Sequence, residues 1–150
     1  MTPTIKHQLS FTQPPEAVWG FITQQELLEL WLMRNDFKPI VGYEFTFRTS
    51  PKPERNFDGV MHCKVLEITP FKTLSYTWAC GPGDGSFTIE SVVSWRLEAK
   101  GTGTTLYLEH AATQKTSDLA HFNMFDAGWE MLLPRIAKLL NDRENGHTNA

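Results

Sequence analysis

Cysteine is scarce in this chain of 150 residues. Cys63 and Cys80 are the only two, and neither stands in a C-x-x-C or other zinc-ligand spacing. An excess of positive charge is missing too, because 17 acidic residues outnumber 14 basic ones. No summed positive field therefore exists to hold nucleic acid or an anionic membrane surface. The sequence predicts buried, reduced cysteines and no nucleic-acid partner.

Long apolar runs are absent as well. No segment approaches the roughly 20 apolar residues that a membrane-spanning helix needs, and the N-terminus carries no apolar stretch of signal-peptide length. We therefore expect a cytoplasmic protein without a membrane span. Residues 1–141 are predicted to form a single domain, and the polar tail at 142–150 is expected to fray.

Motifs for catalysis, phosphate binding and metal binding are also missing. No G-x-S-x-G occurs, and the glycine-rich loop Gly81–Gly85 lacks the G-K-[ST] ending of a phosphate-binding loop. The pair His62 and Cys63 does not favour a metal site, because neighbouring residues of a strand point to opposite faces. The sequence predicts no metal, no cofactor and no assignable catalytic residue.

What the chain does have is aromatic residues and one long amphipathic segment. Ten phenylalanines, five tryptophans and three tyrosines are present. The segment 122–140 carries apolar residues at helical spacing, which predicts a helix with one buried stripe. Pro134 falls inside this helix and removes a backbone donor, so a kink near Glu130 is expected. The stripe consists of Phe122, Phe125, Trp129, Leu132, Leu133, Ile136 and Leu140.

The remainder of the chain alternates with period two, which is typical of antiparallel strands with one buried face. We expect a first strand at 5–11, then two short helices near 15–22 and 26–32, then about six strands. The strand at 60–68 changes parity between Val65 and Leu66, which predicts a β-bulge. The predicted fold class is α+β, with an antiparallel sheet wrapped around the long C-terminal helix.

Several segments together resemble one known family, the activator of heat-shock-protein-90 ATPase homologue-like proteins of the START-related (SRPBCC, birch-pollen-allergen-like) superfamily. The resemblance extends from about residue 6 to residue 140 and implies a helix-grip fold with a cavity between sheet and helix. Co-chaperone members carry an additional N-terminal domain, which we do not expect here. The segments are Pro14–Trp19, Leu27–Trp31, Val65–Pro70, Leu74–Trp78, Val93–Leu97, Gly103–His110 and Gly128–Trp129.

The aromatic residues give a candidate binding site, because small-molecule pockets are lined by aromatic side chains with a few polar groups. A plain filled core is the alternative explanation for the same rings. His110 shares its parity with Leu106 and Leu108, so it either contacts a ligand or is a satisfied core histidine. The candidate ligand-binding residues are Trp31, Phe45, Phe47, Trp78, Trp95, His110, Phe125 and Trp129.

Three functions remain open at this point. The preferred hypothesis is a protein that binds a small hydrophobic or aromatic molecule, such as a lipid or polyketide, in an internal cavity between the sheet and the C-terminal helix. The second is an enzyme of the polyketide cyclase or hydrolase type, with His110 as general acid or base. The third is an interaction module that activates a chaperone ATPase. A small hydrophobic molecule is preferred to a chaperone as the partner.

Overall fold

The computed structural model describes residues 2–144. Its seven strands form one sheet in the order β1-β7-β6-β5-β4-β3-β2, and every neighbouring pair is antiparallel. The strands are β1 (Thr4–Phe11), β2 (Arg34–Asn35), β3 (Glu44–Arg48), β4 (Val60–Thr69), β5 (Thr73–Cys80), β6 (Ile89–Lys100) and β7 (Gly103–Ala112). The helices are α1 (Pro15–Thr23), α2 (Gln25–Trp31), the short 3₁₀ helix η1 (Pro53–Arg55), α3 (Leu119–Leu132) and α4 (Pro134–Glu144).

Strict alternation of buried and exposed side chains sets the inner face of the sheet. In β5 the residues Leu74, Tyr76 and Trp78 are buried while the residues between them are partly exposed. The register of β4 against β5 shifts between Val65 and Glu67, which confirms the bulge that the change of parity predicts. The two short helices after β1 are confirmed as well: α1 contacts β6 and β7, and α2 contacts α1 and β2.

Pairing across the sheet places inward-facing residues in rows. Trp95 of β6 is opposite both Leu74 of β5 and Leu108 of β7. The next row along the strands joins Val93 to His110, and His110 is also opposite Ile5 of β1. His110 therefore lies on the inner face near the end of β7, a strand with neighbours on both sides.

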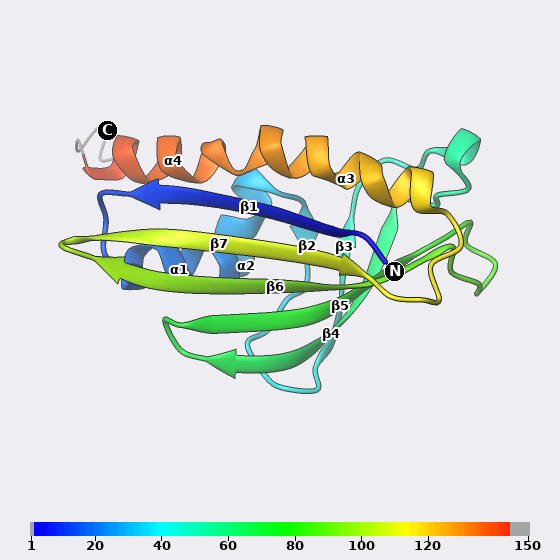
Figure 1. Ribbon diagram of the computed structural model, residues 1–150, viewed down its shortest axis with the longest axis horizontal. Helices are drawn as coiled ribbons and strands as arrows, with labels where there is room; N and C mark the ends of the chain where they lie inside the picture. The colour runs from blue at the N-terminus through cyan, green and yellow to red at the C-terminus, as the bar shows by residue number, and fades with distance from the viewer. Residues whose placement is uncertain (1, 145–150) are drawn as a thin grey trace.

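The C-terminal helical segment runs along one side of the sheet beside β1 (Figure 1). Its predicted stripe faces inward: Phe122, Trp129 and Ile136 are at most 3% exposed. The helix is interrupted at Leu133, which keeps helical dihedral angles directly before Pro134. The interruption follows from the proline, which has no N–H to donate to the carbonyl of Glu130.

The last predicted segment, the polar tail at 142–150, falls mostly outside the described residues. Its first part, 142–144, is the final turn of α4.

In the described range 2–144, no helix has the length and apolar character needed to cross a bilayer. The seven strands thus form one antiparallel sheet that wraps around the C-terminal helical segment α3–α4. The helices α1 and α2 complete the packing.

Candidate functional site

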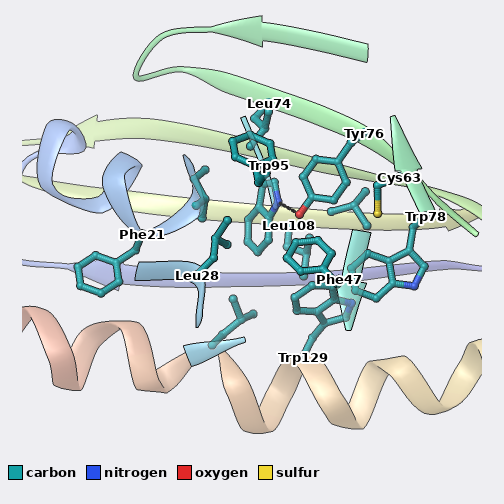
Figure 2. Close-up of a cluster of buried hydrophobic side chains, with 14 of the residues drawn as sticks. Phe21, Leu28, Phe47, Cys63, Leu74, Tyr76, Trp78, Trp95, Leu108 and Trp129 are labelled. Atoms are coloured by element: carbon teal, nitrogen blue, oxygen red, sulfur yellow. Dashed lines mark hydrogen bonds between the residues drawn. The ribbon is translucent and has the colours of Figure 1, made fainter. Parts of the chain in front are cut away.

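The space between the sheet and α3 is filled with aromatic rings along much of its length (Figure 2). Trp129 of α3 lies with its ring centroid 5.6 Å from both Trp78 and Trp95, and 6.4 Å from Trp31. The Trp95 pair meets edge to face and the other two are tilted, and none is stacked face to face, the arrangement that ring quadrupoles disfavour. This aromatic cluster fixes α3 against the sheet.

His110 is part of the cluster and uses both of its ring nitrogens within the protein. Nδ1 lies 3.0 Å from Nε1 of Trp129, which can only donate, so Nδ1 is the acceptor. The proton of the neutral ring is therefore on Nε2, which donates to the hydroxyl of Ser91 at 2.8 Å. The Ser91 hydroxyl in turn donates to the carbonyl of Trp78 at 2.7 Å. The chain of three hydrogen bonds joins α3, β7, β6 and β5.

The imidazole of His110 is fully buried, and burial lowers its pKa from 6.5 to about 3. Desolvation penalises the charged ring, and no carboxylate within residues 2–144 compensates for it. A ring that stays neutral, with both nitrogens bonded to other protein groups, does not exchange protons with a substrate near neutral pH. This is the arrangement of a satisfied core histidine.

A pocket of about 270 Å³ opens at the edge of the aromatic cluster, between α3 and the segments that flank β2 and β3. We call it the helix-edge pocket. Its walls are almost entirely apolar, and among the described residues Lys52 is the one charged residue that lines it. The lining residues are Leu32, Met33, Thr49, Lys52, Phe57, Met61, Trp78, Phe125, Gly128, Trp129 and Leu132.

The eight candidate residues lie together, but they do not have the same relation to this pocket. Trp78, Phe125 and Trp129 line it. The remaining five belong to the surrounding core, where they contact the lining residues or one another: Phe47 packs 5.5 Å from Trp78, and the ring of His110 stacks on Phe125 at 5.4 Å. The other three are Trp31, Phe45 and Trp95, each at most 3% exposed.

Several lining residues could not be found from periodicity. Phe57 and Lys52 belong to the connection between β3 and β4, which has no alternating pattern, and Met33 follows the end of α2. Met61 shares its parity with Cys63 and Val65, so its inward direction was available from the sequence. Residues in irregular connections carry no such signal.

A larger hollow of about 720 Å³ lies on the opposite face of the sheet. Its lining includes the charged residues Glu44, Lys64, Glu90 and Lys115, and its strand residues are mostly of the outward parity. Such a charged surface stays hydrated, so binding there gains little from the removal of water. The helix-edge pocket is therefore the stronger candidate for holding an apolar molecule.

The antiparallel sheet, the gripped C-terminal helix and the aromatic contact between them define a helix-grip protein of the α+β class. The family model described as "Activator of Hsp90 ATPase homolog 1-like protein" matches residues 12–141. The chain belongs to this family. Its resemblance to the family at the level of hydrophobic positions and turns is thus confirmed.

Solved structures share the fold over nearly the whole chain. Protein MLL2253 from Mesorhizobium loti is 35% identical, with 93% of this chain and 97% of that chain covered and a TM-score of 0.79. Protein BH1534 from Bacillus halodurans is 25% identical, with coverages of 92% and 98% and a TM-score of 0.70. The Aha1 dimer from Colwellia psychrerythraea is 21% identical, with coverages of 90% and 93% and a TM-score of 0.69. None of the curated proteins compared with the chain matches it significantly.

Proposed function

We propose that the protein binds a small hydrophobic molecule in the helix-edge pocket. The observation that carries this proposal is a pocket whose walls are apolar and partly aromatic, placed where the sheet meets the gripped helix. Pockets with this character, next to a few polar groups, are typical of small-molecule sites. Membership of a helix-grip family supports the same interpretation.

The volume limits the size of the ligand. An apolar cavity of about 150 Å³ holds one benzene molecule, so a pocket of about 270 Å³ has room for a molecule of roughly bicyclic size. We assign direct ligand contact to Trp78, Phe125 and Trp129 among the eight candidates. Trp31, Phe47, Trp95 and His110 pack against these three rings, and Phe45 packs against Phe47.

Gly128 allows a direct test, because it lines the pocket and a Cβ added there meets no other atom within 4 Å. A leucine at this position fills part of the pocket, and its Cβ meets no neighbouring backbone. We expect Gly128→Leu to weaken the binding of naphthalene by at least about tenfold, a factor that corresponds to roughly 1.4 kcal/mol. Quenching of tryptophan fluorescence measures the affinity, because Trp78 and Trp129 lie in the wall.

The matched control is Ala127→Leu, which adds the same side chain to the exposed neighbouring position of α3. Binding to this variant should equal binding to the unmodified protein. Circular dichroism establishes that both variants keep the fold. Equal affinity of all three proteins for naphthalene, or an absence of quenching by any bicyclic aromatic molecule, would contradict the proposed function.

A further inference from the structure

Trp78 differs from the other deeply buried tryptophans in its indole N–H group. Four tryptophans are at most 3% exposed, and three of them donate this hydrogen to a protein acceptor. Nε1 of Trp78 is buried and has no hydrogen-bond partner within residues 2–144. The three satisfied donors are Trp31 to the carbonyl of Phe21 (2.7 Å), Trp95 to the hydroxyl of Tyr76 (3.0 Å) and Trp129 to Nδ1 of His110 (3.0 Å).

A buried donor without a partner is uncommon and requires an explanation. Removing an N–H group from water without giving it an acceptor is unfavourable, which is why the three other indoles are paired. Three indoles of the same cluster have an acceptor within the protein. The unpaired N–H of Trp78 therefore indicates a position where an acceptor from outside the chain binds.

The position of Trp78 connects the unpaired donor to the helix-edge pocket. Trp78 lines the pocket together with Phe125 and Trp129, whose ring centroids lie 5.8 and 5.6 Å from its own. Figure 2 shows the nitrogen of Trp78 on the side of the ring that faces α3. Trp78 therefore brings an unpaired buried donor to the wall of the pocket, on a ring that forms part of that wall.

Neighbouring polar groups do not supply the missing acceptor. His110 lies 5.3 Å away by ring centroids, but both of its nitrogens are already bonded to Trp129 and Ser91. Nδ1 of His121 is also buried and unpartnered in the described part of the chain, yet His121 is not among the residues that line the pocket. Thr49 and Lys52 do line it and are exposed.

We propose that the ligand carries an uncharged hydrogen-bond acceptor, such as a ketone, ether or aromatic ring nitrogen, that receives the N–H of Trp78. This inference rests on the proposed function and narrows its ligand class. A hydrocarbon of the same shape fills the pocket but leaves the donor unpaired, whereas a ligand with an acceptor pairs it. A site with a buried donor therefore favours ligands that carry the complementary acceptor over analogues that lack it. A charged acceptor is disfavoured, because beside the buried N–H of Trp78 it would lose its water, and the one cation among the described lining residues, Lys52, is exposed.

Naphthalene and isoquinoline test the inference, because they have nearly the same shape and differ by one ring nitrogen. At mildly alkaline pH both are uncharged, and each is titrated against the unmodified protein and against Trp78→Phe, which keeps an aromatic ring but loses the donor. Replacing tryptophan by phenylalanine also changes the shape of the pocket, but this change affects both probes equally. The ratio of the isoquinoline affinity to the naphthalene affinity therefore reports on the hydrogen bond alone. We expect this ratio to fall roughly fivefold in Trp78→Phe, the size of one hydrogen bond.

Nitrogen-15 NMR of the indole N–H groups gives a second measurement that does not depend on a variant that must fold. Isoquinoline should move the Trp78 indole proton downfield, while naphthalene should not. The paired indole of Trp31 serves as an internal control and should not respond in this way. If both probes bind with an unchanged affinity ratio and without a downfield shift, the proposed hydrogen bond from Trp78 to the ligand is wrong. The proposed binding in the helix-edge pocket would still stand. Binding of neither probe would overturn the acceptor and the proposed function together.

Discussion

Trp129 of α3 donates its indole hydrogen to Nδ1 of His110 on β7 over 3.0 Å, and both residues are buried. The bond does two things. It ties the gripped helix to β7, the strand next to the edge strand β1, by a directional contact, and it fixes which nitrogen of His110 carries the proton. Because a buried hydrogen bond of this kind is costly to break on one side only, His110 acts as a positioning residue for the ring of Trp129 in the pocket wall.

The buried, neutral state of His110 predicts how stability changes with acid. Burial lowers its pKa from 6.5 to about 3 in the folded protein. Between pH 6.5 and pH 3 the histidine is therefore protonated in the unfolded chain and neutral in the folded protein. The contribution to stability is complete above pH 6.5 and is lost as the pH falls toward 3. Urea unfolding should show a slope of up to about 1.4 kcal/mol per pH unit from this group.

His110→Asn provides the comparison for this prediction. The asparagine oxygen can accept from Trp129 in place of Nδ1, and the side chain does not titrate. The variant should be less stable than the unmodified protein at pH 8 and should lose less stability between pH 7 and pH 4. Parallel curves for the two proteins in this pH range would show that His110 is not the responsible group.

Ser91 is expected to contribute to stability through the same chain of bonds. Ser91→Ala leaves Nε2–H of His110 and the carbonyl of Trp78 without their partner in the core. We expect a loss of about 1–3 kcal/mol in the free energy of unfolding, measured by urea denaturation. Ser94→Ala is the control, since Ser94 lies on the same strand with the outward parity and is only partly buried; its effect should stay within about 0.5 kcal/mol.

Gly128→Ala should stabilise the protein. Gly128 lies inside α3, has open space where a Cβ would stand, and its backbone is not in the left-handed region. Alanine in a helix is favoured over glycine by about 1 kcal/mol, which corresponds to a rise in Tm of roughly 2–4 °C for a chain of this size. Thermal unfolding followed by circular dichroism measures the shift.

Gly101→Ala tests the reasoning behind the previous prediction. Gly101 also has open space around it, but its φ of +59° is left-handed. Alanine there should lower the Tm, because a side chain disfavours this conformation by about 1–2 kcal/mol. If both alanines changed the Tm in the same direction, backbone conformation would not be what separates the two glycines.

The two thiols should report unfolding. Cys63 and Cys80 are free and buried, and burial raises the pKa of both thiols, that of Cys80 to about 12. Since the thiolate is the reactive form, neither should react with a disulfide reagent at pH 8 until the protein opens. Labelling rates followed across urea concentrations should track the unfolded fraction. Rapid labelling of the native protein would contradict the burial.

Much of the fold can be predicted from the sequence because each segment carries its own periodicity. The alternation of Leu74, Tyr76 and Trp78 identifies an inner face without knowledge of the neighbouring strands. The break in parity after Val65 identifies the bulge, and Pro134 requires an interruption of the C-terminal helix. These features depend on local geometry alone.

The site is less accessible to such reasoning, because it depends on how distant segments meet. Whether the N–H of Trp78 or that of Trp129 finds an acceptor depends on the packing of α3 against the sheet, and both tryptophans look alike in the sequence. Phe57 reaches the pocket from an irregular connection. Sequence reasoning places the rings on the inner face but does not separate the pocket wall from the core behind it.

The strand β2 adds only two residues, Arg34 and Asn35, to the edge of the sheet. Met33, which immediately precedes this strand, lines the helix-edge pocket. Detaching so short an edge breaks few main-chain hydrogen bonds, whereas β6 and β7 pair over ten residues. Transient local fraying of this edge would give the proposed ligand a low-energy route into the helix-edge pocket, and amide hydrogen exchange should be faster there than in the central strands.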